Sequence, residues 1–501
     1  MGQEQPIEHA GDDAGHMRPV AGIAGLTSKG QRRRIITVVV ASLATVLLAA
    51  GYIVADVAGV APGLLTADTA ELESQAAPLA ALPAGAVVAG KAEPNAPIDA
   101  SKANALLDRF AAADGVGTQY SIAIADQHGS VVAQRNAGIP REPASTLKTL
   151  TALAAASSLD MGATFNTETY LNQPSSGAVT VTLKGNGDML LGKGASDPKH
   201  INGRAGLATL AQKTAQGLRQ RGIGTVALAY DDTLFGAARA PKDIAQNNPD
   251  NVYYTPISSM AVDGGRTWPD GVAPDPDSFE GYPPMSERTA ADAAGLFATL
   301  LKQQGIAVRG SVAAAATPAG LSPLASVSSA TLSEVMAFMM RHSDNTLAEE
   351  FGRLVALKAG RENTPQGAVR AVREELERLH IDLAGSTMAD SCGLSPGSRV
   401  TARTLAAVQA HNLTATGAAA AGEGLSIPGL VGTASDRLDN AGAAGLLRVK
   451  TGSLDAVTAM AGNVSRSGGG TLAFAVIVND PDDIIAAKSD VDSFIGDLAG
   501  L

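Results

Sequence analysis

An uncharged, largely apolar run from Ile35 to Val54 follows a polar N-terminal region. About twenty such residues, folded as a helix, span the hydrocarbon core of a bilayer. Basic residues cluster before the run, at Lys29 and at residues 32–34, and the next basic residue after it is Lys91. The positive-inside rule therefore predicts a transmembrane helix over residues 35–55, with everything after it outside the membrane. A cleaved signal peptide is the alternative interpretation.

The segments on either side of this run show no helical or strand periodicity. Residues 1–34 are polar and glycine-rich, which predicts a disordered cytoplasmic tail. Residues 56–100 are mostly alanine, proline and glycine with few charges, which predicts a flexible stalk.

From residue 101 onward the hydrophobic pattern alternates between helical and strand periods. Helices are expected over Ala103–Ala112, Thr149–Ala156, Leu207–Leu218, Thr289–Gln303, Leu332–Met340 and Asp483–Leu498, and further ones starting at Thr346 and at Thr364. Strands are expected over Gln119–Ala125, Val131–Gln134, 179–183, Val226–Tyr230, Leu446–Val449 and Leu472–Val478, with more strand between the last two. The composition and the hydrophobic pattern change between about residues 161 and 319. Within this stretch, Asn247–Pro284 is rich in proline, aspartate and glycine. We expect one domain from residues 101–160 and 320–501, and an inserted α+β module over 161–319 whose return boundary is open.

The charge balance and the numbers of cysteine and histidine residues argue against several classes of function. The 501 residues carry 38 basic and 49 acidic side chains, a net charge of −11, and no basic patch outside the N-terminal tail. These features argue against a nucleic-acid-binding surface. The single cysteine, Cys392, excludes an intramolecular disulfide. The seven histidines are scattered without the spacing of metal ligands, so we predict no metal site and no cofactor.

A nucleophile and a base stand three residues apart where the first long apolar helix of the domain begins. Ser145 and Lys148 share one helical face, so the lysine amine can reach the serine hydroxyl. A lysine accepts the serine proton only if its pKa is lowered by burial or by nearby cations. A second Ser-x-x-Lys, Ser196 to Lys199, is followed by glycine and polar residues and is predicted to be a loop.

Two downstream motifs, one of three residues and one of four, would complete an acyl-transfer site. Ser343-Asp344-Asn345 lies between two predicted helices, where Ser343 can relay a proton and Asn345 can orient Lys148 and a substrate amide. Lys450, Thr451, Gly452 and Ser453 follow a predicted strand. They offer positive charge and hydroxyls for an anionic substrate end, close backbone approach at the glycine, and a second oxyanion donor at the N–H of Ser453.

The order Ser145-x-x-Lys148, Ser343-Asp344-Asn345, Lys450-Thr451-Gly452 is the signature of penicillin-binding proteins and serine β-lactamases. The chain resembles the class C low-molecular-mass penicillin-binding proteins, the D-alanyl-D-alanine carboxypeptidase/endopeptidase family, over roughly residues 101–501. This resemblance rests on the long gap between the first two motifs and on three short stretches. These stretches are Leu183 to Asp188, Tyr230 to Phe235, and Asp390 to Ser395. Ser391-Cys392 stands where the family pattern has Gly-Ser.

The resemblance implies a transpeptidase-like domain with an antiparallel sheet flanked by helices, a mixed α/β (α+β) fold with an inserted α+β module. It also implies that Ser145 attacks the carbonyl between the two terminal D-alanines of a peptidoglycan stem peptide, and that β-lactams acylate the same serine. Asp231 and Asp232 would then be structural in the insertion. The implied partners are stem peptides and β-lactams, with the membrane reached through the N-terminal helix.

Two other functions remain open at this point. A β-lactamase would need fast deacylation, and no glutamate between the first two motifs is obviously placed for that step. A catalytically silent scaffold that binds cell-wall peptides is the second alternative, against which the intact motifs count. From the residues alone, the chain is a serine acyl transferase acting on a short anionic, peptide-like substrate outside the membrane.

Overall fold

The computed structural model describes residues 29–57, 95–269, 271, 275–279, 281–415, 417–438 and 440–501. The chain divides into two units, Met1–Gly90 and Lys91–Leu501. Of the predicted tail (1–34) and stalk (56–100), residues 1–28 and 58–94 lie outside the described residues, whereas residues 29–34, predicted to be disordered, are helical.

The first unit contains one described helix, α1 (Lys29–Val57), which covers the run predicted to span the membrane. Among the residues that the structure describes, no helix combines the length and the apolar character needed to cross a bilayer. The predicted membrane span over residues 35–55 lies within α1 and stays a prediction.

The second unit is built around a five-stranded antiparallel sheet in the order β10-β11-β12-β1-β2. Its strands are β1 (Tyr120–Asp126), β2 (Val131–Arg135), β10 (Leu447–Leu454), β11 (Val457–Ser465) and β12 (Thr471–Asn479). The first and last segments of the domain thus meet in one sheet, where Ile124 of β1 lies opposite Phe474 of β12. The predicted hairpin of β1 and β2 is confirmed.

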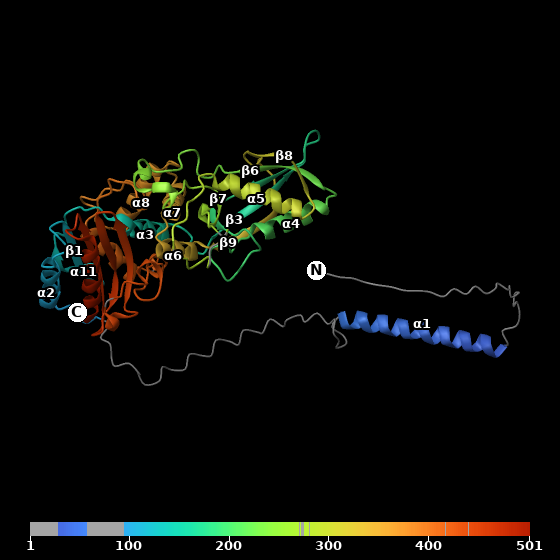
Figure 1. Cartoon of the computed structure of the whole chain (residues 1–501), viewed down its shortest axis with the longest axis horizontal. Coiled ribbons are helices and arrows are strands. Elements are labelled where there is room, and N and C mark those ends of the chain that lie inside the picture. The colour runs from blue at the N-terminus through green and yellow to red at the C-terminus, as the bar shows by residue number, and fades with distance from the viewer. Residues whose placement is uncertain are drawn as a thin grey trace, which may run out of the picture. The chain divides into compact units, whose positions relative to one another are not determined.

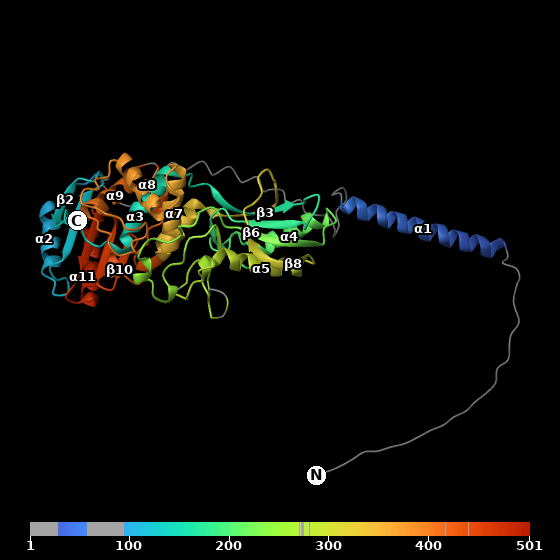
Figure 2. The same ribbon diagram turned by 90° about the horizontal axis from the view of Figure 1, so that it is seen from above.

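Helices cover both faces of this sheet (Figures 1 and 2). They are α2 (Ala100–Ala111) and α11 (Ile484–Asp497) on one face, and α3 (Lys148–Ser158), α6 (Leu332–His342), α7 (Asn345–Lys358), α8 (Pro365–Arg378), α9 (Ala402–Thr414) and the short α10 (Ala419–Glu423) toward the other. Alternate residues of a strand point to opposite faces. Accordingly Ile122 and Ile124 pack with α2 and α11, whereas Ala123 and Ala125 belong to the core that includes α3 and α9.

The inserted module has its own sheet, in the order β8-β6-β4-β3-β9. Its strands are β3 (Thr164–Asn172), β4 (Thr180–Lys184), β6 (Thr225–Asp231), β8 (Ala307–Ala314) and β9 (Pro323–Thr331). The β4–β6 and β6–β8 pairs are parallel, and β3 pairs antiparallel with β4 and β9. Helices α4 (Leu207–Arg219) and α5 (Thr289–Gln303) pack in its hydrophobic core. A small parallel pair, β5 (Asp188–Leu191) and β7 (Met260–Val262), completes it.

The insertion extends beyond the predicted return at residue 319, because β9 pairs with β3 as far as Thr331. Its chain then continues directly into α6, which begins at Leu332 and leads to the Ser343 motif. In both views the insertion lies beside α6 and α7, at one end of the part built on the main sheet (Figures 1 and 2). The predicted fold class, a mixed α/β domain with an antiparallel sheet flanked by helices, is confirmed.

Candidate active site

Ser145 lies on a tight turn immediately before the central helix. The turn is a 3-10 segment, Ala144–Leu147, and α3 begins at Lys148. Side chains three residues apart eclipse each other in a 3-10 turn, and the Lys148 Nζ stands 2.9 Å from the Ser145 Oγ. The preceding residue, Ala144, has a φ of 46°, a left-handed conformation that costs a non-glycine residue energy and often marks a functional turn. The predicted serine–lysine pair therefore forms, although on a 3-10 turn and not on the α-helix itself.

The amine of Lys148 is fully buried and has two further oxygen partners. It lies 2.6 Å from Asn345 Oδ1 and 2.8 Å from the Cys392 carbonyl oxygen. Burial lowers the pKa of Lys148 below its ordinary value, and the nearby Cys392, Asp390, Asp344 and Glu349 oppose this shift. A lysine held in this way is moved toward the neutral form that a general base requires.

Asn345 is fixed in the orientation that serves this contact. Its Nδ2 donates to the Tyr253 carbonyl oxygen at 2.8 Å. A carbonyl can only accept, so the amide nitrogen must face Tyr253 and the amide oxygen must face Lys148. Asn345 is also the first residue of α7, with Asp344 as the N-cap that accepts from the Leu347 N–H.

Ser343 lies between α6 and α7, as predicted. It is the C-cap of α6 and adopts a left-handed φ of 55°. Within the described part of the chain, its hydroxyl makes no hydrogen bond, so it is available for a substrate group. The backbone on both sides of it is held by Ser343 N to Met340 O and by Asp344 N to Met339 O.

The third motif runs along β10, an edge strand of the main sheet. Lys450 is fully buried, and its Nζ donates to the Thr451 carbonyl oxygen at 2.9 Å. Burial, reinforced by the charge of Lys148, lowers the pKa of Lys450 well below its ordinary value. Both causes favour the neutral form of Lys450 over its charged form.

Gly452 brings this strand against the serine turn. A Cβ at position 452 would lie 2.7 Å from the Pro143 carbonyl oxygen and 3.2 Å from the Thr146 nitrogen. Such a distance is too short for any side chain, so glycine is required for this approach. Thr451 is nearly buried with its hydroxyl 2.7 Å from that of Thr433, whereas Ser453 is exposed.

The outer edge of β10 is covered upstream of the motif and open beside it. Ser426 exchanges both backbone hydrogen bonds with Val449, each at 2.8 Å. Among the described residues, no strand pairs with the outer edge at 451–453. An extended peptide can therefore pair with this edge next to Ser145.

A buried loop behind Lys148 was not predicted as part of the site. Asp390 accepts backbone N–H bonds from Cys392 and Gly393 on one carboxylate oxygen, and from Leu394 and Ser395 on the other. These bonds hold the Cys392 carbonyl that Lys148 contacts. No sequence pattern marks a backbone carbonyl as a partner, although a buried aspartate followed by glycine and serine is typical of such loops. The substitution of Cys392 for a serine leaves the carbonyl contact unchanged.

Glu349, Asp390 and Cys392 bring ligand-type atoms within 4.8 Å of one another. Backbone N–H groups bond to three of the four carboxylate oxygens, since Glu349 Oε1 accepts from the Ser391 N–H at 2.6 Å and Asp390 accepts the four bonds above. Burial and the charge of Asp390 raise the pKa of Glu349 to about 8. We therefore interpret the cluster as an anchor for the loop and not as a metal site.

The remaining sequence predictions concern residues away from the chemistry. Ser196 to Lys199 is a loop, as predicted, in which Ser196 Oγ accepts from Gly206 N at 3.0 Å. Asp231 and Asp232 are structural, since they hold Thr233, Thr317 and Ser259 within the insertion. His342 is the last residue of α6, where a charged histidine would interact favourably with the helix dipole, but burial lowers its pKa, which argues against that charge.

Comparison with known proteins gives one consistent result. The family model for "D-Ala-D-Ala carboxypeptidase 3 (S13) family" matches residues 103–278 and 284–497. A carboxypeptidase of Mycobacterium tuberculosis is 35% identical over 367 residues, which is 70% of this chain and 74% of that protein. A D-alanyl-D-alanine carboxypeptidase of an Actinomadura species is 26% identical over 421 residues, 70% and 76% of the two chains. Penicillin binding protein 4 of Haemophilus influenzae has a similar fold, with a TM-score of 0.64 at 20% identity over 81% of this chain and 100% of that one.

Proposed function

The chain belongs to the D-Ala-D-Ala carboxypeptidase 3 (S13) family, and from this premise we propose how its own residues carry out the reaction. It is a serine-type D-Ala-D-Ala carboxypeptidase, a hydrolase that acts on peptidoglycan stem peptides through an acyl-enzyme. The roles of the individual residues follow from the geometry of the site.

One observation carries the assignment of nucleophile and base. A neutral lysine amine has two N–H groups and one lone pair. Asn345 Oδ1 and the Cys392 carbonyl oxygen can only accept, and both lie within hydrogen-bonding distance of the Lys148 Nζ. They therefore take the two N–H groups, which leaves the lone pair for the third neighbour, the Ser145 hydroxyl. This arrangement is that of a base ready to accept the serine proton.

Acylation then proceeds in balanced steps. The Ser145 Oγ gives its proton to the Lys148 Nζ as the Oγ–carbon bond forms at the carbonyl of the penultimate D-alanine. The carbon–nitrogen bond breaks, and the leaving D-alanine amine takes a proton from Lys148 through the free hydroxyl of Ser343. Water then attacks the ester carbonyl and gives a proton to Lys148. The carbon–Oγ bond breaks, and Ser145 Oγ takes that proton from Lys148, which restores the serine and releases the shortened peptide.

Residues at the edge of β10 stabilise the two negative charges of the reaction, the oxyanion and the terminal carboxylate of the substrate. The N–H groups of Ser145 and Ser453 stabilise the oxyanion. Thr451 and Ser453 offer hydroxyls to the terminal carboxylate, Gly452 lets the substrate backbone approach, and the Lys450 side chain supplies the cation on this side of the site. A carboxylate bound nearby would favour the protonated form of Lys450 and so offset the effect of its burial.

The same serine can react with two related amide substrates. A β-lactam presents a strained amide carbonyl to Ser145, and we expect a slowly hydrolysed adduct. A peptide cross-link that ends in D-alanine presents an ordinary amide, so endopeptidase activity is compatible with this site. A β-lactamase is the less favoured function, since the buried Glu349 contacts the loop backbone and not the space beside Ser145.

We place the catalytic part outside the cytoplasmic membrane, because its substrate is part of the cell wall. Cell fractionation with protease protection tests this placement and distinguishes a membrane-attached protein from a released one. Recovery of the whole protein in the cytoplasm would contradict it.

The direct test is release of D-alanine from a short peptide ending in D-Ala-D-Ala. The wild-type protein should release D-alanine, and Ser145→Ala should lower kcat at least about 1,000-fold with unchanged folding. Folded wild-type protein that releases no D-alanine and takes up no penicillin would instead favour a silent scaffold. Rapid turnover of penicillin would favour a β-lactamase.

A further inference from the structure

Three consecutive residues at the start of α7 each contact the inserted module. Asp344 Oδ2 lies 2.5 Å from Arg266 Nη2, and Asn345 Nδ2 donates to the Tyr253 carbonyl oxygen. The hydroxyl of Thr346, the next residue, accepts from Thr255 N at 3.1 Å and donates to Thr255 O at 3.2 Å. The second catalytic motif is therefore shaped from outside its own domain.

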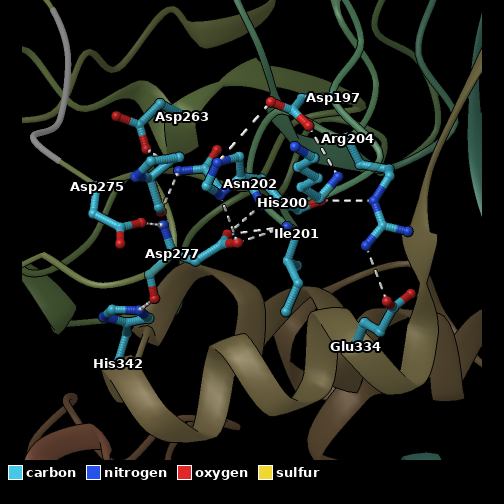
Figure 3. Close-up of polar contacts among 12 residues, drawn as sticks. Asp197, His200, Ile201, Asn202, Arg204, Asp263, Asp275, Asp277, Glu334 and His342 are labelled. Atoms are coloured by element: carbon cyan, nitrogen blue, oxygen red, sulfur yellow. Dashed lines mark hydrogen bonds and ion pairs between the residues drawn. The ribbon is translucent and has the colours of Figure 1, made fainter.

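The residue before the motif is held by the same module. His342 Nε2 lies 2.9 Å from the Asp277 carbonyl oxygen, and its ring stacks on Phe279 at 4.4 Å. Figure 3 shows Asp277 above His342 at the end of α6, with its carboxylate turned toward residues 200–202. That carboxylate accepts from the N–H groups of Ile201 and Asn202. Two loops of the insertion thus meet over the C-terminal end of α6.

Ser343 is the exception within this stretch. Its neighbours on both sides are anchored to the insertion, whereas its own hydroxyl has no partner in the described residues. Its left-handed φ of 55° is strained for a serine and persists only where the surroundings impose it. The position of the Ser343 hydroxyl is therefore set by how firmly Asp344 and His342 are held.

The contact between Arg266 and Asp344 is the charged part of this anchor. Their side chains are 5% and 4% exposed. The guanidinium also lies 3.3 Å from Asp263 Oδ1 and over the Phe279 ring at 4.8 Å. The other oxygen of Asp344 caps α7 by accepting from Leu347 N at 2.9 Å. Removing the arginine would leave a buried carboxylate with one partner lost, at the residue that joins Ser343 to Asn345.

The loop that carries Arg266 is shaped to direct it inward. Gly264 and Gly265 have φ values of 60° and 80°. A Cβ at Gly265 would lie 2.6 Å from Thr289 Cγ2, and one at Gly264 would lie 2.7 Å from the Arg266 guanidinium. The turn therefore needs glycine at both positions for the arginine to reach Asp344.

We propose that Arg266, a residue of the insertion, is a positioning residue for catalysis. By holding Asp344 it fixes the Ser343 hydroxyl and the Asn345 amide relative to Lys148. This inference rests on the proposed roles of Ser343 and Asn345 in acyl transfer. It gives the insertion a part in the reaction beyond its own folding.

The test compares two salt bridges that both join the insertion to α6 and α7. Arg266→Ala removes the one at Asp344, and Arg204→Ala removes the one at Glu334, where the atoms are 3.0 Å apart in the first turn of α6 (Figure 3). Both variants are assayed for kcat and KM on a D-Ala-D-Ala peptide and for the rate of penicillin acylation, well below their melting temperatures. We expect Arg266→Ala to lower kcat and the acylation rate about 100-fold, as small displacements of catalytic groups do. KM should change less than about threefold, and Arg204→Ala should stay within about twofold of wild type.

Arg266→Lys tests the same contact with the charge retained. It should recover about tenfold of the loss, because a lysine can pair with Asp344 but cannot reproduce the guanidinium geometry. If Arg266→Ala does not fold, Arg266→Lys decides, and a kcat about fivefold or more below wild type with unchanged KM supports the proposal. Wild-type kcat in a folded Arg266 variant, or equal losses in the Arg266 and Arg204 variants, would overturn it. A wild-type protein without D-alanine release would overturn the proposed function instead, so the two failures are distinguishable.

Discussion

Replacing Asp390 by asparagine tests the buried loop that contacts Lys148, the proposed general base. The carboxylate accepts four backbone N–H bonds, from Cys392 and Gly393 on Oδ1 and from Leu394 and Ser395 on Oδ2. Asp390→Asn keeps one acceptor oxygen and turns the other into an NH2 group that faces donors. Two buried backbone N–H groups then lose their partner.

The size of the effect follows from those two groups. A buried donor left without a partner costs about 1–3 kcal/mol, so the variant should lose about 2–6 kcal/mol of unfolding free energy. That loss is a large part of the total stability of about 5–15 kcal/mol typical of folded proteins. The Cys392 carbonyl should also shift, so Lys148 loses one of its two accepting neighbours and acylation slows by about tenfold or more.

Urea unfolding followed by circular dichroism measures the first effect, and the rate of penicillin acylation at 25 °C in the folded protein measures the second. Asp382→Asn is the matched control, since Asp382 is exposed and accepts one backbone N–H, from Ala384 at 2.9 Å. It should change stability by less than about 0.5 kcal/mol. An Asp390→Asn protein as stable and as reactive as the control would refute the reasoning.

Three further predictions test the site in other ways. Because burial lowers the pKa of Lys148, the acylation rate should rise with pH through a midpoint below the ordinary value of 10.5, and a pH profile with its midpoint at that value would contradict a base of this kind. Gly452→Ala should slow acylation about tenfold or more, because the added methyl would lie 2.7 Å from the Pro143 carbonyl oxygen. The control Gly468→Ala should leave the acylation rate unchanged, because its methyl would meet nothing within 4 Å. The rate of penicillin labelling measures both. The raised pKa of Glu349, about 8 against 4.5, means that the unfolded chain releases this proton first, so the folded state loses stability as pH rises between these values. Glu349→Gln should therefore gain unfolding free energy relative to wild type at pH 8 but not at pH 4, and equal effects at both would contradict the assignment.

Much of the fold follows from local pattern. The apolar spacing of Thr289–Gln303 predicts α5 to the residue, and Thr364 caps α8 as its proline neighbour suggests. The strands β3, β8 and β9 were missed because their polar and small residues give little alternation, with exposed positions along most of β8. Their place is fixed by pairing within the inserted sheet, a tertiary effect that no single segment reveals.

The candidate site likewise contains residues that could be predicted from the sequence and others that could not. Ser145, Lys148 and Asn345 could be predicted because the chemistry depends on side chains in recognisable settings, and the structure brings the three together. The Cys392 carbonyl and the Arg266–Asp344 pair could not, because a backbone oxygen has no sequence signature and the paired residues are 78 positions apart. The left-handed backbone conformations of Ala144, directly before Ser145, and of Ser343 were likewise unexpected, since neither alanine nor serine favours that conformation.

The central claim is that one hydroxyl, Ser145, is acylated with Lys148 as its base. Mass spectrometry of the penicillin-treated protein, followed by peptide mapping, measures it most directly. The account predicts a single adduct on the peptide that contains Ser145, absent from Ser145→Ala and slowed at least about 100-fold in Lys148→Ala. An adduct on another residue, or undiminished labelling of Ser145→Ala, would contradict it.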